Sequence, residues 1–411
     1  MDVRLSKFHV TRYRTLRDAT FEPNKGLSVL IGPNGVGKTN LLQSILLLRG
    51  GTRRGYGHDE SEESSARISL EASYTINQDS VTYKLDLNAA AGERGPETAA
   101  DAKESWSIVT EKGPLPTIQL PVGFIQYVLN PRQRDSLFRH LSVAVGNLQG
   151  KSVNEIVNKD QLDRLVEVFN FNSNLRYYSA SHFTDPTKCP SSFEVEGDNE
   201  IVDDYGSRGA HRNFMYGLFS LYKKDKPAYD RLMEIVGVDG IKLVSDIRWR
   251  TYALSSSEVK VRQGGNVVRR KRRRTLVIPK VKVGQSAVAF NQLSEGTFKS
   301  LALIFYLMND DWSMLLLEEP EVCVHHGLLS SIVELIKARA RGRQIVISTH
   351  SELVLDLVET SDVFPVSTTR SGTQVKRLDS TLGKTALRAL RNYLQTSGNL
   401  GEYWKHGGFD K

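Results

Sequence analysis

One short loop constrains the fold of this 411-residue chain more than any other feature of its sequence. Residues 32–39 read Gly-Pro-Asn-Gly-Val-Gly-Lys-Thr, which fits the pattern G-x-x-x-x-G-K-[ST]. An apolar run at 27–31 precedes the loop, and a helical pattern at 40–48 follows it. Glycines allow backbone N–H groups to surround phosphate oxygens, and the start of a helix adds a favourable dipole. The sequence therefore predicts a strand, a phosphate-binding loop and a helix, as found in α/β folds.

The side chains of this loop predict a site for ATP and Mg²⁺. Lys38 is expected to reach the β- and γ-phosphates, and Thr39 is expected to bind the Mg²⁺ ion. Other residues are expected to complete the nucleotide site; these are Asn34, Gly35, Gly37 and Asn40. The loop indicates a nucleotide-binding protein, but it does not by itself distinguish between the classes of NTPase.

Two neighbouring carboxylates near the other end of the chain are candidate catalytic residues. The apolar run at 314–317 predicts a buried strand, and it leads directly into Glu318 and Glu319. An acidic residue at the end of such a strand can hold the Mg²⁺ shell, and the next one can activate water. We assign the first role to Glu318 and the second to Glu319. The alternative is that both residues simply begin the following helix, where negative charge is favourable.

Two further segments place polar residues beside predicted strands and helices. A second buried strand at 345–349 leads into His350, whose imidazole can contact the γ-phosphate or orient the attacking water. Upstream of the acidic pair, residues 293–297 read Leu-Ser-Glu-Gly-Thr and open a helix. Ser294 and Gly296 at the start of a helix suit the binding of an anion.

Taken in chain order, the four segments resemble the Walker A, signature, Walker B and histidine-switch motifs of ABC ATPases. The stretches GPNGVGKTN, LSEGT, LLLEEPE and STHS resemble in detail the RecF/SMC/OLD branch of that class. In ABC ATPases the signature contacts ATP that the opposite subunit holds. The resemblance therefore implies a homodimer with two composite ATP sites, alone or within a higher oligomer.

The resemblance also implies roles for residues outside these segments. The opening stretch FHVTRYRTLRDATF resembles the first strand and turn of that branch, which implies that Arg14 contacts a nucleotide phosphate; the alternative is a surface arginine. Gln126, at the end of VGFIQY, is the candidate for the Q-loop glutamine that contacts Mg²⁺. The sequence departs from the usual pattern at Glu318, which replaces an aspartate, and at Glu295 and Thr297, which replace Gly and Gln of the LSGGQ signature.

The predicted fold class is α/β, in the form of an ABC ATPase head. Period-two segments predict an antiparallel β subdomain beside the P-loop core; they lie at 67–76, 81–87 and 106–110. Helical periodicity beginning near residue 131 predicts a helical subdomain or insertion. We expect an N-terminal lobe with Walker A, the helical subdomain, and a C-terminal lobe with the other motifs, at 1–125, 126–240 and 241–411.

Composition excludes several classes of protein. The chain is 39% hydrophobic and 25% charged, and no apolar run approaches the roughly 20 residues of a transmembrane helix. Two cysteines are too few for a disulfide framework. The first residues lack the pattern of a secretory signal. We therefore expect a soluble, cytoplasmic protein without a membrane segment.

The basic charge of the chain is concentrated in one place. The net charge is +8, and six consecutive cations run from Arg269 to Arg274, between strand-like segments and near a Gly264–Gly265 turn that predicts a hairpin. Six like charges need an anionic partner or free solvent. The partner can be DNA or an acidic phage protein, and the alternative is a solvated hairpin. Aromatic and basic residues at 177–178 and 208–212 also cluster in sequence, but no motif assigns them a role.

Two stretches, LGEYWKHGGFDK and NQLSEGTFKSLALIF, resemble stand-alone ATPases of bacterial anti-phage defence, such as the ATPase subunits of the PARIS and Septu systems. That resemblance implies an ATP hydrolase that dimerises on ATP and regulates a partner effector, a Toprim or HNH nuclease encoded nearby. Residues 367–411 are too few for a Toprim domain, so nuclease chemistry is expected from another chain. Two alternatives remain, namely a RecF-like DNA repair ATPase and an ATP-binding scaffold with little turnover.

Overall fold

The computed structural model shows an α/β chain that divides into two compact units, each described here by itself. The first unit comprises Met1–Tyr177, Asp311–Glu319 and Ile336–Lys411, and the second comprises Tyr178–Asp310 and Pro320–Leu335. The residues that the structure describes are 2–49, 67–88, 103–121, 157–196, 207–261, 267–309, 312–322, 324–369, 372–396 and 398–409. No helix in these ranges is long and apolar enough to cross a bilayer.

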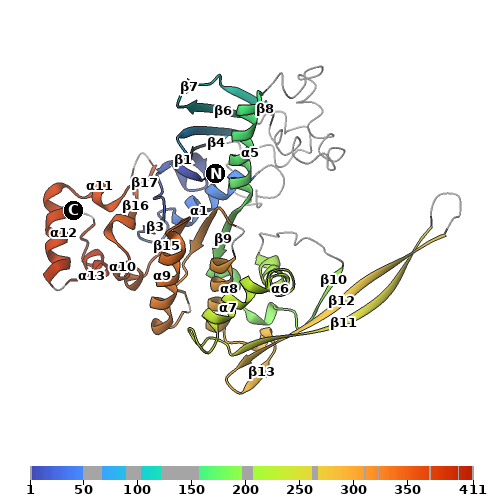
Figure 1. Ribbon diagram of the computed structural model, residues 1–411. Helices are drawn as coiled ribbons and strands as arrows, with labels where there is room; N and C mark the ends of the chain where they lie inside the picture. Colours follow the sequence, from blue (N-terminus) through green and yellow to red (C-terminus); the bar gives the residue numbers. More distant parts are fainter. Residues whose placement is uncertain are drawn as a thin grey trace. The chain divides into compact units, whose positions relative to one another are not determined.

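A six-stranded sheet forms the centre of the first unit, in the order β17-β16-β3-β15-β14-β9 (Figure 1). Its strands are β3 (Leu27–Ile31), β9 (Leu175–Ser179), β14 (Met314–Glu318), β15 (Gln344–Thr349), β16 (Val363–Thr369) and β17 (Gly372–Val375). The four strands β16, β3, β15 and β14 run parallel to one another. Every residue of β3 and β15 is buried, as expected for parallel strands that are covered on both faces.

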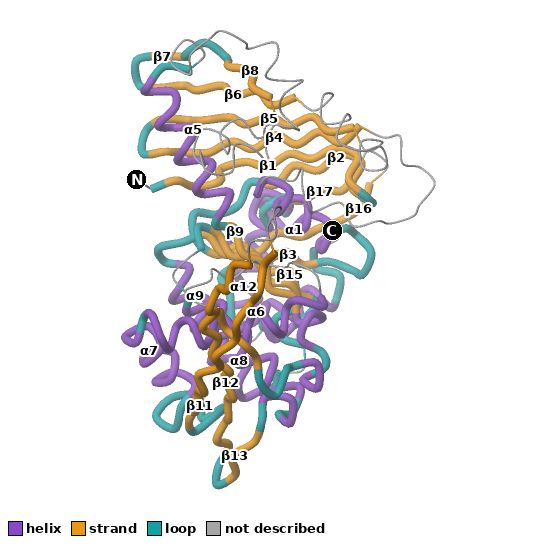
Figure 2. Tube along the Cα trace, turned by 90° about the vertical axis from the view of Figure 1, so that its right-hand side faces the viewer, coloured by secondary structure: helices purple, strands orange, loops and turns teal. Residues whose placement is uncertain are grey.

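A second, antiparallel sheet of the first unit confirms the predicted β subdomain (Figure 2). Its strands are β1 (Val3–Tyr13), β2 (Leu16–Phe21), β4 (Arg67–Ile76), β5 (Asp79–Asn88), β6 (Lys103–Thr110), β7 (Gly113–Pro114) and β8 (Ile118–Pro121). Along β4, alternate residues from Ile68 to Ile76 are buried, so one face of this sheet forms part of the core.

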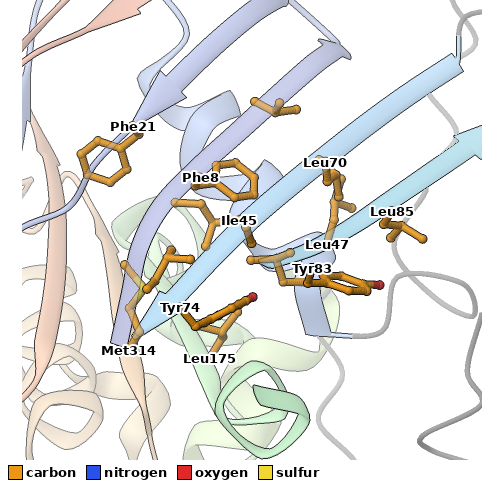
Figure 3. Close-up of a cluster of buried hydrophobic side chains, with 14 of the residues drawn as sticks. Phe8, Phe21, Ile45, Leu47, Leu70, Tyr74, Tyr83, Leu85, Leu175 and Met314 are labelled. Carbon is orange, nitrogen blue, oxygen red and sulfur yellow. The ribbon is translucent and has the colours of Figure 1, made fainter. Parts of the chain in front are cut away.

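The core of the first unit joins both sheets to two helices (Figure 3). Helix α1 (Lys38–Leu46) contributes Ile45, and α5 (Lys159–Ser173) packs Phe171 edge-on against Tyr74 at 5.7 Å between ring centroids. The Tyr74 hydroxyl donates to Asn172 Oδ1 at 2.8 Å, which provides the buried phenol with a partner. The remaining helices of this unit are α10 (Glu352–Asp356), α11 (Leu378–Thr381), α12 (Lys384–Thr396) and α13 (Leu400–Lys405).

The second unit combines helices with a small antiparallel sheet. Its helices are α6 (Ser207–Lys224), α7 (Lys226–Val236) and α8 (Glu295–Met308), while α9 (His326–Ala340) begins here and ends in the first unit. Its sheet has the order β10-β12-β11 with β13 on β12; the strands are β10 (Phe193–Glu196), β11 (Asp246–Val261), β12 (Val267–Val283) and β13 (Ser286–Val288). Aromatic rings fill the core, with Phe214 in edge contact with Phe298 and Phe305.

The predicted hairpin is present as the paired strands β11 and β12, and its Gly264–Gly265 turn lies outside the described residues. The sequence places the basic run between strands, but the structure continues β12 through all six cations, opposite Leu254 to Val259 of β11. In Figure 1 this part of the ribbon extends away from the helices of the second unit. Arg274 pairs with Glu194 of β10 at 3.2 Å.

Within the segment predicted as helical, 126–240, the structure places the two strands β9 and β10. Strand β9 lies beside β14 in the central sheet, between α5 and α6 in the chain. Residues 122–156, where most of the predicted insertion falls, lie outside the described part of the chain. The three-part division at 125 and 240 therefore stays a prediction.

One buried glutamine connects the two sheets of the first unit. Gln344, the first residue of β15, is 2% exposed. Its Oε1 accepts from the Leu5 N–H at 2.8 Å, and its Nε2 donates to the Leu5 carbonyl at 2.9 Å and to the Asn24 carbonyl at 3.0 Å. Strand β2 pairs with β1 only from Phe8 onward. At Leu5, the Gln344 amide forms the hydrogen bonds that a neighbouring strand would otherwise form with the backbone.

We expect Gln344→Met to lower the free energy of unfolding by about 3 kcal/mol, because buried groups of Leu5 and Asn24 would lose their partners while side-chain length is kept. Urea denaturation of the purified variant measures this change. The matched control is Gln374→Met on β17, at an exposed position, which should change stability by less than about 0.5 kcal/mol. Equal midpoints for the two variants would show that the amide does not stabilise the contact between the sheets.

Candidate active site

The phosphate-binding loop connects the buried strand β3 to helix α1, as the sequence predicts. Gly37 caps the helix with φ of 101°, a left-handed conformation in which a Cβ would also lie 2.9 Å from Leu16. Gly35 faces open space, while Asn34 is exposed at the crest of the loop. The loop therefore leaves room on its outer side and directs the first N–H groups of α1 there.

The Lys38 ammonium lies within the curve of this loop. Its side chain is buried, and Nζ donates to the carbonyls of Gly32 at 2.8 Å and Pro33 at 2.9 Å. These two bonds place the ammonium at the mouth of the loop, where a phosphate would meet it.

The next residue connects the loop to the acidic pair. The Thr39 hydroxyl donates to Glu318 Oε1, although the two residues lie 279 positions apart in the chain. Glu318 is the last residue of β14, and its other oxygen, Oε2, accepts from the Tyr177 hydroxyl of β9. A hydroxyl and a carboxylate oxygen side by side are the hard ligands that Mg²⁺ prefers, so the residues present fit that ion.

Glu319 and His350 face each other at the same edge of the central sheet. Glu319 has a positive φ of 46°, and its N–H donates to the Ser348 carbonyl at 2.9 Å. Its carboxylate Oε1 lies 3.6 Å from His350 Nε2. A non-glycine residue held in this conformation costs free energy, and such residues are concentrated at functional sites.

The β1–β2 turn lies against the first turns of α1. The Arg14 guanidinium donates to Gln43 and lies over the Tyr13 ring, 5.4 Å from its centroid. Beside it, Asn40 Nδ2 donates to Thr15 Oγ1 at 2.6 Å. Arg14 and Asn40, both predicted from the sequence, thus lie on the helix side of the phosphate-binding loop.

Comparisons with known proteins match both halves of this site. Residues 7–184, which include the loop, match a family model described as "AAA domain". Residues 249–356, which include the acidic pair and His350, match one described as "AAA domain, putative AbiEii toxin, Type IV TA system". The DNA replication and repair protein RecF of Teredinibacter turnerae is 40% identical over 47 residues, and that of Shewanella piezotolerans is 30% identical over 89 residues. The chain is therefore similar to AAA-type P-loop ATPase domains and, over short stretches, to RecF.

The matched regions are short relative to the RecF proteins. They cover 11% and 22% of this chain and 12% and 21% of the two relatives. Among solved structures, the SMC head domain from Thermotoga maritima has a TM-score of 0.41, 11% identity, and coverage of 91% of this chain and 98% of that chain. A Pyrococcus furiosus Smc head bound to the C-terminal domain of ScpA has a TM-score of 0.46, 11% identity, and coverage of 95% and 100%.

The remaining predicted residues lie elsewhere. Ser294 caps α8 in the second unit, where its hydroxyl accepts from the Thr297 N–H at 3.2 Å, and Gly296 follows in the first turn. The capped start of α8 suits an anion, as the sequence indicates. Gln126 lies outside the described residues, so its role stays a prediction.

Sequence reasoning missed Tyr177 as a site residue. The run Leu-Arg-Tyr-Tyr-Ser at 175–179 is short, rich in residues that favour strands and almost entirely buried in the structure. Two tyrosines beside Arg176, directly after a helix, were too weak a signal to place this strand next to the acidic pair.

His350 is held in its neutral form at pH 7. Burial lowers the pKa of this imidazole below its usual 6.5, and the nearby Lys38 charge lowers it further. The Glu319 carboxylate and a hydrogen bond with the Gly32 backbone act in the opposite direction but are smaller effects. A neutral imidazole can accept a proton or a hydrogen bond on one nitrogen while donating from the other.

We expect the pKa of His350 to rise in Lys38→Ala, because a positive charge is removed, and to fall further in Glu319→Gln, because a negative charge is removed. Histidine ring NMR signals followed from pH 4.5 to 8 measure both values, with His350→Gln used to assign the resonance. Shifts in the same direction in the two variants would contradict the charge arrangement described above.

Proposed function

We propose that the protein binds MgATP between two copies of itself, hydrolyses it, and uses this cycle to regulate a partner effector in bacterial anti-phage defence. The proposal rests on the grouping of Lys38, Thr39, Glu318, Glu319 and His350 at one edge of the central sheet. Each side chain has the chemistry that ATP hydrolysis requires, and the resemblance of the motifs to those of ABC ATPases supports the same function.

In this proposal the phosphate-binding loop holds the substrate. Lys38 turns its ammonium from the Gly32 and Pro33 carbonyls to the β- and γ-phosphates. Thr39 and Glu318 hold Mg²⁺, which, when bound, offsets charge on the phosphates. Arg14, Asn34 and Asn40 complete the nucleotide contacts, and Gly35 and Gly37 keep the outer side of the loop open.

Glu319 is the proposed general base. It follows Glu318 directly, and its positive φ directs its carboxylate toward His350. We assign to Glu319 the removal of a proton from the attacking water. His350, which is neutral, accepts or donates a hydrogen bond that orients this water or the γ-phosphate.

The proposed dimer brings Ser294 and Gly296 of one copy to the ATP of the other. Two observations support it: Ser294 caps α8 at a helix start that suits anions, and the motifs resemble those of ABC ATPases. Dimerisation then depends on bound ATP, because the γ-phosphate is shared across the interface.

We expect Glu319→Gln to bind ATP without turnover and to convert the protein to a dimer in MgATP. The amide keeps the size of the carboxylate but cannot accept the proton, and turnover should fall about 100-fold or more. Light scattering after size exclusion, with and without MgATP, measures the dimer. Lys38→Ala is the matched negative control and should stay in the nucleotide-free state, because it lacks the charge that binds phosphate. If Glu319→Gln hydrolyses ATP at the parent rate, Glu319 is not the general base.

Two observations support the defence role and the partner. The description of the family model matched over 249–356 names a toxin–antitoxin system. Stretches of the chain also resemble ATPase subunits of defence systems. We propose a Toprim or HNH nuclease, encoded nearby, as the effector. We further propose that the cations from Arg269 to Arg274 receive an anionic trigger, either DNA or an acidic phage protein.

Replacing Arg269, Arg270, Arg272 and Arg273 with glutamine should abolish binding of that anion while leaving nucleotide binding intact. Arg274 is kept because it pairs with Glu194. Duplex DNA and an acidic phage protein are titrated over a salt series; DNA binding should fall more steeply with salt, since phosphate contacts release counterions. The control removes the same charge from exposed positions, at Lys376, Lys384, Arg388 and Arg391. Equal binding by the two variants would show that the basic run is a solvated hairpin without an anionic partner. Stimulation of ATP hydrolysis by DNA alone would favour a RecF-like repair role.

A further inference from the structure

A tyrosine outside all four motifs contacts the acidic residue at the end of β14. The Tyr177 hydroxyl donates to Glu318 Oε2, while Thr39 donates to Oε1. The two donors come from different elements, β9 and α1. Each oxygen of the Glu318 carboxylate therefore has a hydroxyl partner, and the plane of the carboxylate is defined by both.

The tyrosine is itself rigidly placed. Its side chain is buried, with the residue 8% exposed, and its strand lies next to β14 in the central sheet. A buried aromatic ring has only two side-chain torsions, so its hydroxyl occupies a small volume. Tyr177 can thus direct a flexible neighbour without being displaced by it.

Glu318 is such a flexible neighbour. Its side chain has one more methylene than the aspartate usual at this position in ABC ATPases, and therefore one more torsion to fix. In the structure, Oε2 is directed to β9 and Oε1 is directed to the phosphate-binding loop. Without the Tyr177 contact, the carboxylate could turn its oxygens away from Thr39.

We propose that Tyr177 is a positioning residue for the metal: it anchors one oxygen of Glu318 so that the other faces Thr39 and a shared Mg²⁺ ion. The inference rests on the metal role proposed for Glu318. Hydrogen bonds from outside a coordination shell orient the metal ligands, and their loss typically weakens metal affinity by about 10- to 100-fold.

The adjacent residue provides a matched control. Successive residues of a strand face opposite sides, and Tyr178 has its hydroxyl on the Lys299 carbonyl of α8 at 3.2 Å, within the second unit. Tyr178 is 1% exposed. Tyr178→Phe therefore removes the same atom from an equally buried ring, one position away, without touching Glu318.

The test compares Tyr177→Phe, Tyr178→Phe and the parent by equilibrium binding of a fluorescent, non-hydrolysable ATP analogue. Each protein is titrated with Mg²⁺ at fixed nucleotide, and nucleotide affinity is also measured in EDTA. We expect Tyr177→Phe to raise the Mg²⁺ midpoint about tenfold and to leave affinity in EDTA unchanged. Tyr178→Phe should change neither value.

A double-mutant cycle with Glu318 gives a second measurement that does not depend on Tyr177→Phe alone. Glu318→Asp shortens the side chain away from the tyrosine and should itself raise the Mg²⁺ midpoint. Adding Tyr177→Phe to Glu318→Asp should then produce no further change, since the contact is already lost. Additive effects would show that the two residues act independently and would overturn the inference.

The outcomes separate this inference from the proposed function. If the parent binds the analogue in a Mg²⁺-dependent way and Tyr177→Phe has the same Mg²⁺ midpoint, the positioning role alone is overturned. A Tyr177→Phe protein that loses affinity equally in EDTA and in Mg²⁺ also overturns it, because the tyrosine then supports the site only structurally. A parent that binds no analogue overturns the ATP-binding proposal itself.

Discussion

Parallel hydrogen bonding among β3, β15 and β14 determines where each polar group of the site lies. In this register Ile31 is level with Thr349, and Ser348 is level with Glu318. The strands leave the sheet at the same edge, so the residues that follow them are neighbours although they are distant in sequence. A slip of one residue in either pairing would direct Glu318 to the opposite face of the sheet.

The side chains of β3 are buried and almost all apolar. The first four residues of β14 are also buried and apolar. Charge therefore begins where the strands end. The backbone at Glu319 adapts to this boundary: its N–H stays bonded to Ser348, while its positive φ turns the chain out of the sheet. The two consecutive glutamates thus meet different partners: Glu318 contacts Thr39 and Tyr177, and Glu319 lies beside His350.

The central sheet could be predicted because β3, β14 and β15 are short apolar runs that end in recognisable polar motifs. Strand β9 could not, because it contains Arg176, follows a helix and becomes a strand only by pairing with β14. The motifs also name the five residues that meet at one edge, yet Tyr177 escaped notice because no local pattern reveals which side chain reaches Glu318. Similarly, the turn at Arg14 is stabilised by Gln43 and Asn40, contacts that depend on the tertiary fold.

The chemistry of Gln344 has a consequence for how the two sheets respond to their surroundings. A carboxylate or an imidazole in the same place would gain or lose a proton, and its pattern of donors and acceptors would change with acidity. A carboxamide does not titrate, so the contacts with Leu5 and Asn24 keep the same donors and acceptors in acid and in base. The attachment of the antiparallel sheet is thereby insulated from proton uptake, even while His350, six residues further along the same segment, changes charge.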